Sequence, residues 1–93
     1  MADTRNVLAA SGLIDTGKGV LAGLVITCSS STAALATFYD NTAGSGTKIL
    51  EGYVSSTHPL VIFFSDRFAP IYATGLYLLL AVNLTATVWT RQV

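Results

Sequence analysis

The stretch Phe38-Tyr39-Asp40-Asn41-Thr42-Ala43-Gly44-Ser45-Gly46-Thr47 decides the fold, because small and polar residues separate two apolar runs there. Asn and Gly tolerate the positive φ angles that connections between antiparallel strands require. The flanking runs, 34–39 and 47–53, are rich in the Leu, Ile, Thr and Tyr residues that favour strands. The stretch therefore predicts a β-hairpin.

The same alternation of turn clusters and short apolar runs continues along the whole chain. The strands that it predicts are 7–14, 20–28, 34–39, 47–53, 60–64, 71–73, 76–82 and 85–91. Short strands at regular spacing are typical of a sandwich or barrel. We expect an all-β chain that forms a single-domain antiparallel β-sandwich, jelly-roll-like, with about eight strands. Residues 1–16 would supply an N-terminal arm and the first strand, and residues 17–93 the sandwich core.

Period-two reading gives one strand a defined inner face. In 20–28 the even positions are all apolar, which predicts that the core receives Val20, Ala22, Leu24, Ile26 and Cys28.

The charge content is low for a chain of 93 residues. Five Lys and Arg balance five Asp and Glu, so that 11% of residues are charged, against roughly 25% in ordinary soluble domains. With 52% hydrophobic residues the composition excludes intrinsic disorder. Zero net charge and the lack of a basic run argue against binding to nucleic acid. We expect a neutral surface that is partly covered by another molecule.

A membrane hairpin is the alternative that these numbers raise. Residues 19–39 and 68–90 lack charge over the length of a spanning helix. However, six small, polar-leaning residues, 27–32, occupy the centre of the first stretch, and the uninterrupted apolar core of the second, 76–82, is only seven residues long. Seven residues fit a buried strand, so we expect no membrane span.

Residues that carry chemistry are scarce. Cys28 and His58 are the only cysteine and histidine, which excludes an intrachain disulfide and a Cys/His zinc site. Cys28 ends an apolar run and is expected in the core or an interface, whereas His58 precedes a proline in a polar loop. Asp15, Asp40 and Asp66 stand beside predicted turns, where carboxylates cap the backbone. The sequence thus predicts no enzyme, no catalytic residue, no metal ligand and no cofactor.

Two predicted strands, 60–64 and 76–82, are apolar on both faces. In a two-layer sandwich one face of every strand points outward, and large exposed apolar patches mark interfaces. We therefore expect another chain to cover these faces. The alternative is a closed barrel in which Tyr77 and Leu79 lie under a loop.

Candidate interface residues follow from residue type and position. Tyr and Trp dominate binding hot spots, although each aromatic residue here could equally belong to the core. The polar segment 1–6 lacks a core pattern and is expected to reach onto a neighbouring subunit. The candidates are Tyr72, Tyr77, Leu79, Trp89, Met1 and Asn6.

Several segments between residues 17 and 91 resemble small β-sandwich virion proteins of tailed bacteriophages. They are Lys18-Gly19-Val20-Leu21, the hairpin 38–47, Gly75-Leu76-Tyr77 and a final short strand ending near Arg91. The resemblance implies a virion location and a head decoration or cement protein on the major capsid protein. It would act there as a small homo-oligomer, a dimer or trimer, without catalytic residues.

Two other functions remain open under this resemblance. One is a structural protein of the tail or the head-tail joint. The other is a small carbohydrate- or receptor-binding module, with a shallow platform formed by Tyr53, Tyr72 and Trp89.

Overall fold

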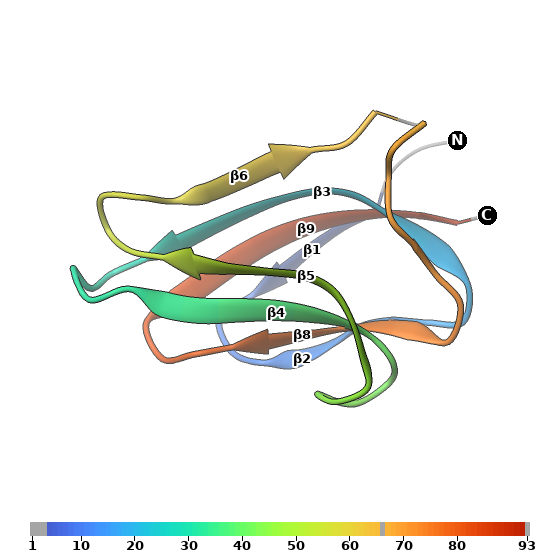
Figure 1. The fold of residues 1–93 in the computed structure, drawn as a ribbon, viewed down its shortest axis with the longest axis horizontal. Helices are drawn as coiled ribbons and strands as arrows, with labels where there is room; N and C mark the ends of the chain where they lie inside the picture. The colour runs from blue at the N-terminus through green and yellow to red at the C-terminus, as the bar shows by residue number, and fades with distance from the viewer. Residues whose placement is uncertain (1–3, 66, 93) are drawn as a thin grey trace.

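The computed structural model describes residues 4–65 and 67–92, which fold into two antiparallel β-sheets packed face to face (Figure 1). Sheet A contains, in spatial order, β1 (Thr4–Leu8), β9 (Leu84–Gln92), β3 (Gly19–Cys28) and β6 (Leu60–Phe63), and β7 (Ile71–Tyr72) also pairs with β3. Sheet B contains, in spatial order, β2 (Gly12–Thr16), β8 (Gly75–Leu80), β4 (Ala34–Asp40) and β5 (Thr47–Val54). The described residues thus form nine strands, against about eight expected for this architecture.

The strand order is that of a jelly roll. Strands far apart in the sequence pair in a nested series: β1 with β9, β2 with β8, β3 with β6, and β4 with β5. The chain therefore behaves as one long hairpin that is rolled up so that its strands divide between the two sheets. The predicted hairpin at 38–47 is the tip of that roll, and the predicted fold class is confirmed.

The core lies between the two sheets. Phe38 and Leu78 from sheet B meet Leu24 and Val88 from sheet A, and none of the four is accessible to solvent. In β9 the even positions from Leu84 to Thr90 are buried and the odd positions are partly or fully exposed, as period-two reading predicts. The single thiol, Cys28, is buried in this core, as expected.

The predicted strand 7–14 is wrong in one respect, because the chain crosses between the sheets in the middle of it. Its first part belongs to β1 in sheet A and its last part to β2 in sheet B. At the crossing, the Ser11 hydroxyl accepts a hydrogen bond from Leu80 N at 2.7 Å and lies 3.1 Å from Leu80 O, to which it donates. Residues 4–16 thus contribute an edge strand to each sheet.

A β-bulge changes the predicted inner face of β3. The pairing with β9 shifts between Leu21 and Gly23, which reverses the alternation of side chains at that point. Leu21 therefore enters the core with no solvent exposure, whereas Val20, expected inside, lies on the outer face opposite Ile71. Beyond the bulge, Leu24 and the later even positions point inward, as predicted.

One end of the sandwich, where the β4–β5 and β7–β8 connections meet, is held by a carboxylate and an amide side chain. Asp40 accepts hydrogen bonds from the backbone N–H groups of Thr74 and Ala73 at 2.9 and 3.1 Å, and these bonds lower the pKa of Asp40. In the hairpin, Asn41 Nδ2 donates to Ser45 O at 2.8 Å. The predicted capping role of Asp40 is confirmed, whereas Asp66 lies outside the described residues.

The described part of the chain contains no helix that is long and apolar enough to cross a membrane.

Candidate interaction face

The outer face of sheet A is built from rows of side chains that run across the strands. Directly opposite residues in antiparallel strands point to the same side of the sheet. One row consists of Val7, Thr87, Val25 and Val61. The next consists of Arg5, Trp89, Gly23 and Phe63. The third consists of Arg91, Val20 and Ile71. We call these three rows the sheet A face.

The sheet A face is apolar and open to solvent. Val7 is 65% exposed, Phe63 64%, Ile71 62% and Val61 53%. In β6 these exposed residues alternate with Leu60 and Ile62, which pack against the core. Residues 60–64 are therefore apolar on both sides because one side of β6 packs against the core, whereas the other lies on the molecular surface.

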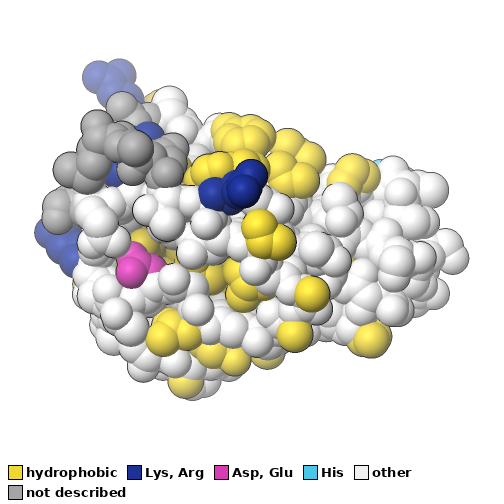
Figure 2. All heavy atoms as spheres, turned by 180° about the vertical axis from the view of Figure 1, so that it is seen from behind, with side chains coloured by type: hydrophobic (Ala, Val, Ile, Leu, Met, Phe, Trp, Pro, Cys, Tyr) yellow, Lys and Arg dark blue, Asp and Glu magenta, His cyan; other side chains and the backbone are white. Residues whose placement is uncertain are grey.

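The two large rings of the face pack together over a glycine. The ring centroids of Phe63 and Trp89 are 5.3 Å apart. A Cβ atom added to Gly23, which lies between them in the row, would come within 2.5 Å of Phe63 Cδ1. The Phe63 ring thus rests on the backbone of β3, and only glycine permits that approach. Seen from behind, hydrophobic side chains gather in the upper part of the molecule with a basic side chain against them (Figure 2).

The charge on the sheet A face has one sign. Within its three rows the charged residues are Arg5 and Arg91, and neither an aspartate nor a glutamate is present. Both arginines lie in the half of the face formed by β1 and β9, whereas the β3, β6 and β7 half is uncharged.

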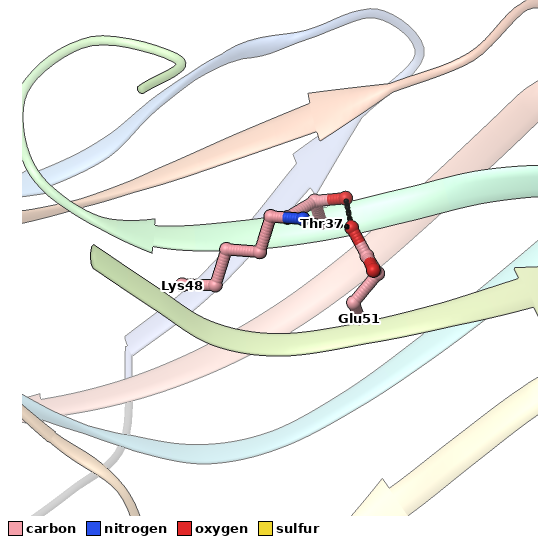
Figure 3. Close-up of polar contacts among 3 residues, drawn as sticks. All are labelled: Thr37, Lys48 and Glu51. Atoms are coloured by element: carbon pink, nitrogen blue, oxygen red, sulfur yellow. Dashed lines mark hydrogen bonds and ion pairs between the residues drawn. The ribbon is translucent and has the colours of Figure 1, made fainter. Parts of the chain in front are cut away.

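The outer face of sheet B combines a polar network with exposed apolar side chains, of which Leu13 is 45%, Tyr53 69% and Leu79 40% exposed. Thr37 points outward from β4 and yet is only 2% exposed. Its hydroxyl donates to Glu51 Oε2 at 2.9 Å, and Lys48 Nζ lies 3.1 Å from the same oxygen (Figure 3). The pairing lowers the pKa of Glu51 and raises that of Lys48. This side of the sandwich thus has a polar network that the three rows of the sheet A face lack.

The hairpin tip also covers part of sheet B. A Cβ atom on Gly44 would lie 3.1 Å from Tyr77 Cε1 and 3.6 Å from Leu79 Cδ1, so the backbone of the tip rests on these two side chains. Tyr77 is partly buried, and Leu79 is 40% exposed. A loop of the same chain therefore covers part of the outer face of β8, as the alternative interpretation expected for Tyr77 and Leu79. The architecture itself is a sandwich and not a closed barrel.

The interface role expected for Tyr72 needs correction. Tyr72 is fully buried, and its hydroxyl donates to Asp15 Oδ2 at 2.6 Å. Its two-residue strand turns Ile71 outward and Tyr72 inward, with the ring against Gly19. Burial, followed by the contact with Asp15, raises the pKa of Tyr72. Tyr72 is a core residue.

The other candidates lie in different places. Trp89 belongs to the sheet A face, as its odd position in β9 predicts. Asn6 lies in β1, where its Nδ2 donates to Val88 O at 3.4 Å, so residues 4–6 are held by their own sheet, and the expected contact with a neighbouring subunit stays a prediction. Met1 lies outside the described residues. Val7, Val61 and Ile71 were not among the residues predicted from the sequence, because their common face depends on pairing between distant strands.

Groups that could carry chemistry are not gathered at one place in the described residues. In residues 4–65 and 67–92 no group of three or more His, Cys, Asp or Glu side chains could hold a metal ion, and no pocket is present. Cys28 is buried, and His58 is exposed, as expected, with its ring 3.0 Å from the Thr57 hydroxyl. No protein-family model, curated protein or solved structure matches the chain. The sheet A face is therefore the feature on which a function can be argued.

Proposed function

We propose that the protein is a non-enzymatic structural subunit of a virion, which decorates the head shell and stabilises it through self-association and contact with the major capsid protein. The observation that carries this proposal is the exposed, apolar sheet A face with arginines at one side. Such a surface favours attachment to protein, because covering it removes apolar groups from water.

Size and shape support an adhesive role. The largest exposed patch of a typical monomer covers about 300–600 Å² and is often functional. The five strands of sheet A have 5, 9, 10, 4 and 2 residues, and at about 4.8 Å between strands and about 3.3 Å per residue they give a face on the order of 500 Å². The outer face of sheet A is thus of that size.

The fold agrees with the virion class but does not define it. Jelly rolls occur in viral capsid proteins and also in lectins and cupins, and a fold alone does not imply a function. The lectin alternative needs a common aromatic platform, which the geometry disfavours. Tyr72 is buried, Trp89 lies on the outer face of sheet A, and Tyr53 lies on that of sheet B.

The proposal is tested on particles. We expect the protein to be found by mass spectrometry in purified virions of the phage whose genome encodes it. Immunogold labelling should place it on heads, and particles that lack the gene should release DNA at a lower temperature. Adding the purified protein should restore the wild-type temperature.

Two matched variants test whether the sheet A face is the surface that attaches the protein to the particle. Phe63→Asp places a carboxylate on this face, and Tyr53→Asp places one on the opposite side of the sandwich, where Tyr53 is 69% exposed. Restoration should fail with Phe63→Asp and persist with Tyr53→Asp. Labelling of tails would support a tail protein instead, and absence from the virion would refute the proposal.

A further inference from the structure

We propose that the sheet A face is the interface of a homodimer, in which two copies stack face to face about a two-fold axis parallel to the strands. The inference deepens the proposed function and rests on it, since it names the partner that covers this face. Other proteins, including a shell protein, are alternative occupants that the experiment below separates from a second copy.

The area of the face fits a second copy. Two sheets pack about 10 Å apart, with strand directions within about 30° of each other. A face on the order of 500 Å², covered by its equal, buries on the order of 1,000 Å² in total, which meets the lower limit for a specific interface. Stacking two such flat sheets also reproduces the way in which sheets A and B pack inside each copy.

The rows of the face are complementary to themselves. A two-fold axis that runs along the strands between β9 and β3 keeps each row opposite the same row of the partner, reversed from end to end. Strand β1 then lies over β6, so that Val7 faces Val61, the two most exposed valines of the face. In the next row, Arg5 faces Phe63, and an arginine over an aromatic ring is a favourable contact.

The position of Arg5 on the edge strand favours this axis over one perpendicular to the strands, although Arg91 of β9 then lies one strand spacing, about 4.8 Å in projection, from Arg91 of the other copy. With the parallel axis, the two Arg5 side chains lie at opposite edges of the interface, three strand spacings or about 14 Å apart. That separation exceeds the screening length of about 10 Å at moderate ionic strength. A perpendicular axis would place β1 over β1 and bring both Arg5 residues to the same edge, although no carboxylate of the three rows could balance them.

Thiol cross-linking tests the arrangement, because Val7 and Val61 are on opposite edges of sheet A. Residues that face each other across the proposed interface have Cα atoms about 10 Å apart, beyond the reach of about 7 Å that a disulfide spans, so a short bismaleimide joins the thiols instead. Single variants Val7→Cys and Val61→Cys are made in a Cys28→Ala background, mixed, and treated with the bismaleimide. We expect the mixture to form a covalent dimer that neither variant forms alone.

The matched control pairs Val7→Cys with Tyr53→Cys, which lies on the other side of the sandwich. Trapping of Val7 with Val61 should exceed this control at least about tenfold, because the interface raises the effective concentration of the two thiols. Circular dichroism verifies that each variant folds. Light scattering of the unmodified protein should give twice its 9.7 kDa mass.

Each contrary result has a defined meaning. A cross-link between two Val7→Cys chains would indicate the perpendicular axis and overturn the proposed dimer. A monomer by light scattering, or a dimer trapped only through Tyr53→Cys, would overturn it as well. If such a protein still restores particles in a manner that depends on Phe63, the proposed function stands and a shell protein covers the face. If restoration fails too, both proposals fail.

Discussion

The rings of Phe63 and Trp89 pack against each other on the outer face of sheet A, with centroids 5.3 Å apart and planes tilted by 48°. The contact joins β6, a four-residue edge strand, to β9 across the glycine of β3 that separates them. Aromatic pairs of this geometry contribute about 0.5–1.5 kcal/mol beyond area burial. The same two rings form the most prominent part of the surface proposed for dimerisation.

Trp89 should report occupancy of this surface by its fluorescence, because it is the only tryptophan of the chain. As protein concentration rises, we expect its emission to shift to shorter wavelength and acrylamide quenching to weaken, since a second copy removes the indole from water. Phe63→Ala should abolish both changes. Constant emission over a range in which light scattering shows dimers would mean that another surface associates.

Removal of Phe63 should affect association far more than folding. Since the ring is mostly exposed, Phe63→Ala should lower the free energy of unfolding by only about 1 kcal/mol, the value of the aromatic pair. Urea unfolding of dilute protein measures this change, and analytical ultracentrifugation measures dimerisation. Tyr53→Ala, at a similarly exposed site on sheet B, should leave dimerisation intact. Equal losses of association in the two variants would contradict a role specific to sheet A.

Local signals were sufficient to predict the fold but not the composition of the face. The turn residues Asp40 to Gly46 and the regular strand spacing are short-range features, and the hairpin and the jelly roll that they predict are present. In contrast, Val7 and Val61 come together on one face through β9 and β3, a register that no local pattern specifies. The sequence analysis identified 60–64 as two-sided but could not identify which distant strands complete the surface.

Tyr72 shows why residue type alone misled the site prediction. A strand of two residues has no period from which an inner and an outer side can be read. Its direction is set by pairing with β3, which directs the ring over Gly19, and by Asp15, which accepts its hydroxyl hydrogen bond. Both β3 and Asp15 are distant from Tyr72 in sequence. The aromatic ring that suggested a binding hot spot packs inside the molecule instead.

Tyr72→Phe should test this buried hydrogen bond. A bond to a charged acceptor is worth about 1.5–3 kcal/mol, so the free energy of unfolding at neutral pH should fall by about 2 kcal/mol. Because the folded state raises the pKa of Tyr72 above its ordinary value of 10.0, its contribution is complete below pH 10 and is lost as pH rises further. Denaturant unfolding between neutral and alkaline pH should show a steeper loss for the wild type. Identical slopes would contradict the shift.

Asp40 should control stability at the acidic end. Its pKa is lowered in the folded state by the N–H groups of Thr74 and Ala73, so its contribution is complete above its ordinary value of 3.8 and is lost as pH falls below it. Asp40→Asn should cost about 1 kcal/mol at neutral pH, a value reduced for solvent screening. The difference from wild type should vanish in strong acid. Glu51→Gln, a carboxylate of an exposed ion pair, serves as the control and should have a smaller effect.

Cys28 should behave as a reporter of global unfolding. Its thiol is 8% exposed in the core between the sheets, and its Sγ accepts a hydrogen bond from Ser30 N at 3.4 Å. Ellman's reagent should therefore leave the native protein unmodified and react at the midpoint of urea unfolding. A cysteine introduced as Val61→Cys in the Cys28→Ala background should react at once when the protein is dilute, and more slowly at concentrations that favour the dimer. Rapid reaction of Cys28 in native buffer would contradict the packing of β3 described above.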